Sequence, residues 1–163
     1  TCKVVTGIPM LDTFYVALAK EAQMDLFIEC TGDLWVDDHH TAEDVSIAIG
    51  QCLTQALGTK AGLNRMWLGE GKHNDAAIEV TMDLSNRPYF GHDLHEVLGR
   101  QEYVVDENGS ATKLSCEMME HVLDSLVMNG RMTVHVVQVG NNDNSSVEDV
   151  VLATAKAFGA ALR

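Results

Sequence analysis

A segment from the first half of the chain recurs at its C-terminal end, and this repeat restricts the folds that the sequence can adopt. Aligned without gaps, residues 38–57 fall on residues 143–162. The identical pairs are Asp38/Asp143, Glu43/Glu148, Asp44/Asp149, Val45/Val150, Ala48/Ala153, Ala56/Ala161 and Leu57/Leu162. A segment that occurs twice is typical of a fold built from two similar halves. With 163 residues and 46% hydrophobic content, the chain can bury the core of one such domain.

The spacing of apolar residues supports the same division. It predicts helices over residues 10–23, 41–58, 114–128 and 147–162, and strands over residues 25–29, 78–84 and 132–139. Val104 and Val105 lead into Asp106-Glu107-Asn108-Gly109, a hairpin-like turn signal. Residues 62–71 read as a loop between the halves. Because a helix–strand–helix order occurs twice, we predict a single α+β domain made of two repeats, about 1–85 and about 86–163.

The charge balance excludes several classes of partner. A net charge of −13 repels the phosphates of nucleic acids and of anionic membrane surfaces. A small phosphorylated substrate remains compatible with this charge if a few Arg or Lys side chains converge in one cleft. No apolar run approaches the roughly 18 residues that span a bilayer, and no signal-like segment opens the chain. The four widely spaced cysteines fit free thiols in a reducing compartment, so we expect a soluble, cytoplasmic protein.

The segment Asp37-Asp38-His39-His40-Thr41-Ala42-Glu43-Asp44 has the clearest chemical content. If a helix starts at Thr41, His39 and His40 lie on the loop that enters it, and Glu43 lies on its first turn. Imidazole and carboxylate groups can then point at one place from a rigid helix terminus. This combination of ligands suits Mn²⁺, Fe²⁺ or Zn²⁺.

Other residues bear on this metal-site hypothesis. Asp37 and Asp38 are placed to accept the second ring N–H of a ligating histidine, which fixes its tautomer. Glu148, which duplicates the first carboxylate, and His121, in a predicted helix, both favour a metal site. The alternative is a surface histidine pair beside an acidic helix start, because carboxylates are favourable at that end of a helix.

Four segments together resemble the imidazoleglycerol-phosphate dehydratase family: residues 6–12 (TGIPMLD), 32–44 (GDLWVDDHHTAED), 83–89 (DLSNRPY) and Glu120-His121. The resemblance runs in order from residue 6 to residue 163. It implies a duplicated fold like domain 2 of ribosomal protein S5, with helices between two mostly antiparallel sheets. It also implies a 24-subunit shell with manganese sites at subunit contacts, which converts imidazoleglycerol phosphate into imidazole acetol phosphate in histidine biosynthesis.

The resemblance assigns metal ligands one by one. The family's ligands match His39, His40, Glu43, His121 and Glu148 here, and Glu43 is also the candidate proton donor. Thr13, Asn144 and Ser145 stand where the family has three further histidines. The resemblance therefore implies an incomplete manganese site with one or two ions and a reduced turnover. The alternative is a non-catalytic structural or regulatory homologue that keeps the oligomeric fold.

The family's phosphate-binding positions are also partly retained. Arg65 and Arg87 match two arginines of the family that suit bidentate phosphate contacts. The family's lysine in the final helix aligns with Leu152, and Lys156 lies one turn further on. The family's N-terminal strand pair and basic tail have no counterpart, so the sequence is either trimmed or has lost these parts.

The remaining histidines have simpler interpretations. His135, in an apolar strand, is predicted to be a packed histidine. His92 and His95 form an alternative candidate metal site, although two histidines three residues apart in a short acidic segment are more often solvated.

Overall fold

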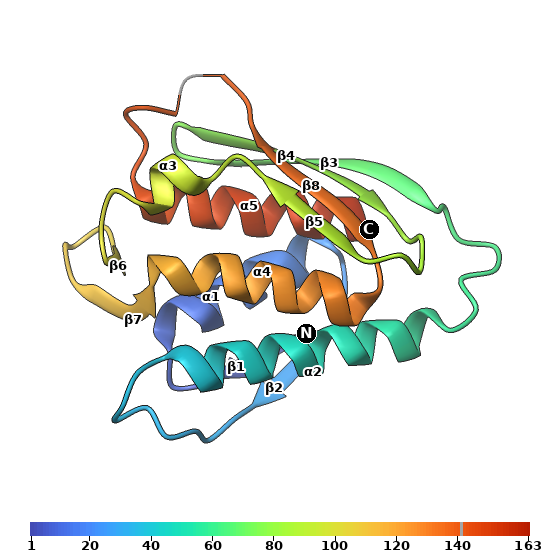
Figure 1. Ribbon diagram of the computed structural model, residues 1–163, viewed down its shortest axis with the longest axis horizontal. Helices are drawn as coiled ribbons and strands as arrows, with labels where there is room; N and C mark the ends of the chain where they lie inside the picture. Colours follow the sequence, from blue (N-terminus) through green and yellow to red (C-terminus); the bar gives the residue numbers. More distant parts are fainter. Residues whose placement is uncertain (141) are drawn as a thin grey trace.

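The computed structural model describes residues 1–140 and 142–163 (Figure 1). Its elements, in chain order, are β1 (Cys2–Val5), α1 (Pro9–Glu21), β2 (Leu26–Glu29), α2 (His39–Leu57), β3 (Met66–His73), β4 (Ala76–Asp83), β5 (Tyr89–His92), α3 (His95–Leu98), β6 (Tyr103–Val105), β7 (Ala111–Ser115), α4 (Cys116–Gly130), β8 (Thr133–Gln138) and α5 (Val147–Leu162).

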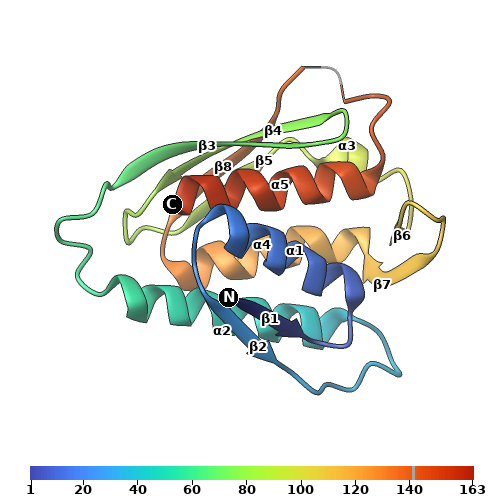
Figure 2. The ribbon, with the colours of Figure 1, turned by 180° about the vertical axis from the view of Figure 1, so that it is seen from behind.

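The helices lie between a four-stranded sheet and a short pair of strands. The sheet has the order β3-β4-β8-β5, in which β3 and β8 are antiparallel to β4 and β5 is parallel to β8. On the other side of the helices, β1 and β2 form a parallel pair. Strands β6 and β7 form a separate antiparallel hairpin. Figures 1 and 2 show the sheet along one face and the β1-β2 pair on the opposite face. This arrangement confirms the predicted α+β fold, with a sheet of only two strands on the second face.

The long helices pack in a reciprocal way. If the repeat is followed along the chain, α1 corresponds to α4, and α2 corresponds to α5. In the structure α2 packs on α4, while α1 packs on α5. Each helix of one predicted repeat therefore packs mainly on the non-equivalent helix of the other, and the division into two repeats stays a prediction. Apolar residues from all four long helices and from the sheet belong to one continuous core, in which α4 and α5 pack directly on the sheet.

Strand β3 corrects the sequence prediction of a loop over residues 62–71. Its eight residues pair with β4 along their whole length, and its inner face packs on α5. A Cβ atom added to Gly69 would lie 2.1 Å from the carbonyl oxygen of Ala157, and one added to Gly71 would lie 2.1 Å from that of Ala153. The two glycines that favoured a loop are thus required by the close approach of a helix backbone.

All four cysteines are free. Within the described residues, no helix combines the length and the apolar character that crossing a membrane requires. His135 is exposed on β8 and lies against Tyr89, with ring centroids 5.3 Å apart, so the prediction that it is packed in the core is wrong.

Candidate metal centre and cavity

The motif histidines are the first two residues of α2, not part of the loop before it as the sequence predicted. Asp38 is the N-cap of the helix, and its backbone already has a helical conformation (φ −85°, ψ −8°). The Oδ1 atom of Asp37 accepts a hydrogen bond from the backbone N–H of His39 at 3.1 Å. A carboxylate thus satisfies a free N–H at the helix start, so the turn that carries both histidines is held in place.

Helices α2 and α4 bring three of the predicted ligands together. The Nε2 atom of His39 lies 3.6 Å from Oε2 of Glu43, one turn further along α2. The ring of His121, on α4, lies beside that of His39, with centroids 5.2 Å apart. His40 lies next to this group, its ring centroid 6.1 Å from that of His39. These side chains remain partly or fully exposed, so they are accessible from solvent.

Asp38 ties the start of α2 to the start of α4. Its carboxylate accepts hydrogen bonds from the backbone N–H of Ser115 at 2.7 Å and from the Ser115 hydroxyl at 3.1 Å. Ser115 is the N-cap of α4, the helix that carries His121. The expected bond from Asp37 or Asp38 to a histidine ring N–H stays a prediction, but the observed bonds already fix the relative position of the two helices.

A second group of imidazole and carboxylate side chains lies on the other side of α4. His92 ends β5, His95 begins the short helix α3, and Glu120 precedes His121 on α4. The Nδ1 atom of His95 lies 2.9 Å from Oε1 of Glu120, and Nε2 of His92 lies 4.0 Å from Oε2 of the same carboxylate. Burial lowers the pKa of His92, so this ring favours its neutral form.

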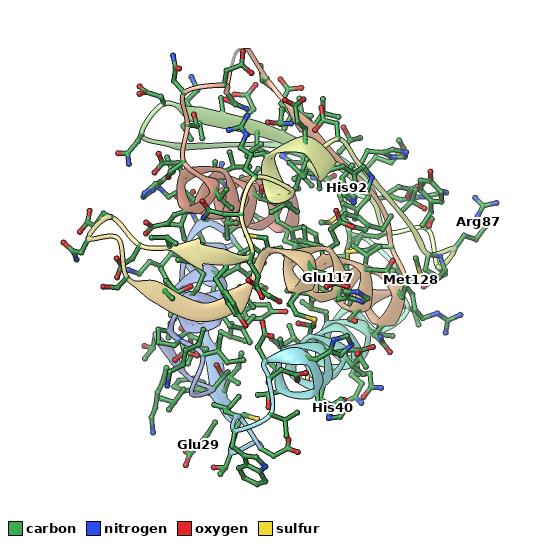
Figure 3. All side chains as sticks on the ribbon, turned by 60° about the vertical axis from the view of Figure 1, so that its left-hand side comes forward. Glu29, His40, Arg87, His92, Glu117 and Met128 are labelled. Atoms are coloured by element: carbon green, nitrogen blue, oxygen red, sulfur yellow. The ribbon has the colours of Figure 1, made fainter. Side chains whose placement is uncertain are left out.

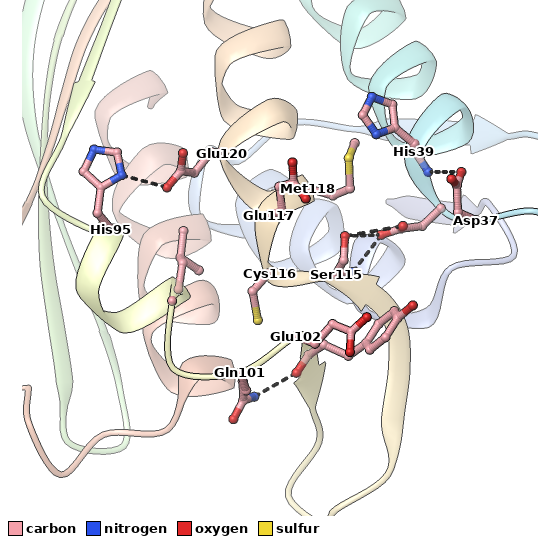
Figure 4. A pocket seen from close by; sticks show the side chains of 14 residues that line it. Asp37, His39, His95, Gln101, Glu102, Ser115, Cys116, Glu117, Met118 and Glu120 are labelled. Carbon is pink, nitrogen blue, oxygen red and sulfur yellow. Dashed lines mark hydrogen bonds and ion pairs between the residues drawn. The ribbon is translucent and has the colours of Figure 1, made fainter.

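A cavity of about 490 Å³ separates the two groups. His39 and Asp37 line one side, and His95 and Glu120 line the other, with Glu117 between them (Figure 4). Consecutive residues of an α-helix point about 100° apart, so Glu120 and His121 direct their side chains to different groups. The cavity wall is therefore built from α2, α3 and α4, with imidazole on both sides.

Two other positions of the family's ligand set, Glu148 and Thr13, are less favourable for holding a metal ion. Burial raises the pKa of Glu148 at the start of α5, and the nearby carboxylates of Asp149, Asp106 and Glu107 act in the same direction. The hydroxyl of Thr13 donates to the carbonyl oxygen of Pro9 within α1.

The second repeat's replacements for histidine differ in exposure. Asn144 is exposed, whereas Ser145 is buried. Among the residues that the structure describes, the hydroxyl of Ser145 is the buried side-chain oxygen without a hydrogen-bond partner. A short buried hydroxyl does not present the nitrogen ligand that a histidine would supply here.

Both predicted phosphate-binding arginines lie at the far end of α2. A helix of 19 residues is about 28 Å long, and Arg65 follows its C-terminal end. The guanidinium of Arg65 makes a bidentate contact with Asp83, at 2.7 and 3.0 Å. Arg87 points away from the body of the molecule (Figure 3). Figure 1 shows that the loops carrying these residues lie opposite the start of α2, so the structure does not bring them to the histidines of the same chain.

Two further cations, which the sequence did not single out, lie with these arginines. The Nζ atom of Lys60 lies 3.3 Å from the carbonyl oxygen of Arg131, and burial lowers the pKa of this lysine, as does the charge of Arg131. The hydrogen bond from Arg65 lowers the pKa of Asp83, and the charges of Arg87 and Lys60 act in the same direction. We call Lys60, Arg65, Arg87 and Arg131 the basic end of the molecule. Only the fold could reveal it, because these residues are far apart in sequence.

The group of His39, His40, Glu43 and His121 fits a borderline divalent cation. Imidazole nitrogens and a carboxylate oxygen are suitable ligands. The pairwise contacts all run through His39, so the four side chains would have to move toward one another to share an ion. The group contains no basic side chain that would repel a cation. The donor set and its accessibility therefore support metal binding at the start of α2.

Comparison with known proteins relates almost the whole chain to the family that its sequence motifs resemble. Residues 6–162 match the family model of imidazoleglycerol-phosphate dehydratase. The imidazoleglycerol-phosphate dehydratase of Saccharomyces cerevisiae is 41% identical over 154 residues, which are 94% of this chain and 66% of that protein. The corresponding protein of Zygosaccharomyces bailii is 40% identical over 154 residues, 94% of this chain and 65% of that protein. The chain thus spans about two thirds of the length of these curated relatives.

The fold agrees with a solved structure. The crystal structure of imidazoleglycerol-phosphate dehydratase from Staphylococcus aureus superimposes with a TM-score of 0.79 and 24% sequence identity, covering 99% of this chain and 84% of that chain. This structural similarity shows that the two proteins share a fold. The family model covers nearly all the residues that form this fold. The chain described here belongs to the imidazoleglycerol-phosphate dehydratase family.

Proposed function

We propose that this protein dehydrates imidazoleglycerol phosphate to imidazole acetol phosphate in histidine biosynthesis. The observation that carries the proposal is the family match over residues 6–162, together with the grouping of His39 and Glu43 of α2 with His121 of α4. The residues that would hold the metal, which we propose to be manganese in one or two copies, are His39, His40, Glu43, His121 and Glu148.

A bound divalent cation would supply positive charge that stabilises negative charge on the imidazole ring of the substrate. The hydroxyl of the substrate is a poor leaving group and needs a proton donor. Glu43 reaches solvent beside His39 and is placed to give that proton, so that the C–O bond breaks and water leaves. The proton lost from the adjoining carbon returns to the Glu43 carboxylate, directly or through water, and the resulting enol ketonises to the product.

The phosphate of the substrate would bind at the basic end, through Arg65 and Arg87. Because α2 separates this end from the histidines of the same chain by about 28 Å, one chain does not supply both parts. We therefore propose that active sites form between chains, with the start of α2 from one and the basic end of another. Such shared sites require self-assembly, and we propose the 24-subunit shell expected for the family. We also propose that the protein acts in the cytoplasm.

Turnover of imidazoleglycerol phosphate by the purified protein, with and without added Mn²⁺, tests the proposal. We expect Mn²⁺-dependent formation of imidazole acetol phosphate. Since histidine is replaced at Thr13, Asn144 and Ser145, we expect a turnover below that of a protein with all eight family ligands. No product at saturating Mn²⁺, from protein shown to be folded and assembled, would contradict the proposal.

The second candidate function is that of a non-catalytic structural or regulatory homologue. The burial of Ser145 and the exposure of Asn144 favour it, because neither replaces an imidazole at the start of α5. Elemental analysis distinguishes the two functions. Protein that assembles normally but keeps no manganese after dialysis would support the structural role, and one or two ions per chain would support the dehydratase.

A further inference from the structure

A second candidate metal site lies outside the residues assigned to manganese above. We propose that His92, His95 and Glu120 form a separate binding site for a divalent cation of the zinc type. The three side chains come from β5, α3 and α4, so the fold, not a local sequence motif, brings them together. This inference does not depend on dehydratase activity.

The distances suit a tetrahedral ion. One ligand atom from each residue lies within 4.8 Å of the other two. At zinc–ligand bond lengths of about 2.0–2.2 Å, two ligand atoms on a tetrahedral ion are roughly 3.4 Å apart. The separation of 2.9 Å between His95 Nδ1 and Glu120 Oε1, and that of 4.0 Å between His92 Nε2 and Glu120 Oε2, lie on either side of this value. Small side-chain rotations would therefore accommodate the ion.

The surroundings also favour a bound cation. The side chain of His92 is only 8% exposed, and its ring stacks on Phe90 with centroids 5.0 Å apart, so one ligand is held rigidly. Its ring lies 4.3 Å from that of His95. Two imidazoles and one carboxylate are a frequent ligand set for zinc, and they leave a fourth position open for water or another ligand. His95 and Glu120 line the cavity opposite His39, so an ion here would lie on the opposite wall (Figure 4).

Binding at Nε2 of His92 requires a change of the ring's tautomer. The Nδ1 atom of His92 accepts the backbone N–H of Leu94 at 3.1 Å, which places the proton of the neutral ring on Nε2. A cation at Nε2 shifts that proton to Nδ1 and ends the bond from Leu94. Without an ion, His95 is hydrogen-bonded to Glu120, and His92 accepts a hydrogen bond from Leu94. A bound ion would replace these hydrogen bonds with metal–ligand bonds.

Equilibrium dialysis of chelator-treated protein against Zn²⁺ alone, followed by elemental analysis, tests the site. We expect His95→Gln and Glu120→Gln each to weaken the binding of one ion per chain at least about tenfold. His39→Gln should keep this ion, and His135→Gln, which changes an exposed histidine outside both groups, should bind zinc as the unmodified protein does. Co²⁺ in place of Zn²⁺ should give the visible absorption of a tetrahedral site, which His95→Gln removes.

Unchanged zinc binding in both His95→Gln and Glu120→Gln would overturn the proposal, as would loss of all zinc in His39→Gln. His95 and Glu120 have side chains that are 72% and 36% exposed, so these variants do not remove core packing. If circular dichroism shows that either variant misfolds, the site is tested instead by treating the protein without substitutions with diethyl pyrocarbonate. Zn²⁺ should protect His95 and leave His135 reactive, and equal modification of both with and without Zn²⁺ would contradict the site.

Discussion

Glu43 carries both a proposed ligand role and the proposed proton transfer, so its replacement affects two steps at once. Glu43→Gln keeps the size of the side chain but removes its charge and its acidity. We expect turnover to fall at least about 100-fold and manganese affinity to fall with it, measured by steady-state kinetics and by metal analysis.

Asp44→Asn is the matched control, because Asp44 is the next residue of α2 and lines an apolar groove on another side of the helix. It removes the same charge at nearly the same place and should leave turnover within about twofold. Equal losses in the two variants would show that Glu43 acts only through the net charge of the helix start.

Cys116, at the start of α4, offers a test of burial. Burial raises the pKa of its thiol from the ordinary value of 9.0 to about 11. The folded protein thus favours the neutral thiol. The neutral Cys116 thiol makes its full contribution to the stability of the folded protein below about pH 9, and this contribution decreases as the pH rises toward 11. At pH 8 we expect iodoacetamide to label the exposed Cys52 well before Cys116, measured by mass spectrometry of peptides. Equal labelling rates would contradict the buried environment.

The individual residues of the candidate site show what sequence reasoning can and cannot reach. The DDHHTAED motif placed His39 and Glu43 within one helix turn, as the structure shows, because this spacing is local; their role as ligands stays a prediction. The grouping of His95 with Glu120 depends on the packing of α3 beside α4, and the basic end depends on loops more than 60 residues apart, such as those of Lys60 and Arg131. The His92–His95 spacing was visible in the sequence, but the third ligand that makes it a candidate site was not.

Two helix starts are held together by Asp38, and the strength of this connection can be measured. Asp38→Asn weakens two hydrogen bonds to Ser115, one of them to a backbone N–H that would then have a weaker partner. We expect the free energy of unfolding to fall by about 1–3 kcal/mol, measured by urea denaturation. Asp37→Asn, in an exposed residue with one bond to the backbone of His39, should cost less. The reverse order would mean that Asp37, not Asp38, organises the start of α2.

The packing of β3 on α5 leaves no room for a side chain at Gly71. A Cβ atom there would lie 2.1 Å from the carbonyl oxygen of Ala153 and 2.3 Å from the backbone nitrogen of Ala157, so the helix must move. We expect Gly71→Ala to lower the free energy of unfolding by about 1–3 kcal/mol or more, measured by urea denaturation. Glu70→Ala, on the exposed face of the same strand, is the control and should change it far less. Equal effects would show that strand propensity, not packing, governs this position.

Among the secondary-structure elements, the long helices and the strands β2, β4 and β8 were predicted, whereas β1, β3 and β5 were not. Helix α5 was predicted with its observed limits, because its apolar positions recur at helical spacing over 16 residues. Strands β1 and β5 have only four residues each, and each is held by a parallel partner elsewhere in the sequence. Strand β3 was missed because its glycines, which fit it against α5, also lower its local strand propensity.

The separation of the histidines from the basic end predicts complementation between chains. Glu43→Gln disables the proposed metal end, and Arg87→Gln disables the proposed phosphate end of a different chain. If each active site uses both ends from two chains, assemblies made from a mixture of the two variants contain some sites without either substitution. Random mixing of equal amounts gives roughly one quarter of such sites.

Turnover of the two variants, measured separately and after joint refolding, checks this prediction. We expect each variant alone to be nearly inactive and the mixed assemblies to recover activity toward that fraction. Mixing Glu43→Gln with His39→Gln is the control and should restore nothing, because both changes lie at the same end. Light scattering should show a mass well above the 17.8 kDa of one chain in every sample. Absence of recovery, with mixed assemblies demonstrated, would place the whole site in one chain.

The reciprocal helix packing also has a consequence for how the chain is made. As the ribosome releases this part of the chain, α1 and α2 emerge before α4 and α5, the helices that cover their apolar faces. The nascent polypeptide therefore carries uncovered apolar surface until α5 has been made, and stable folding must wait for that helix. Molecular chaperones that bind exposed apolar segments would meet this protein mainly while it is still attached to the ribosome.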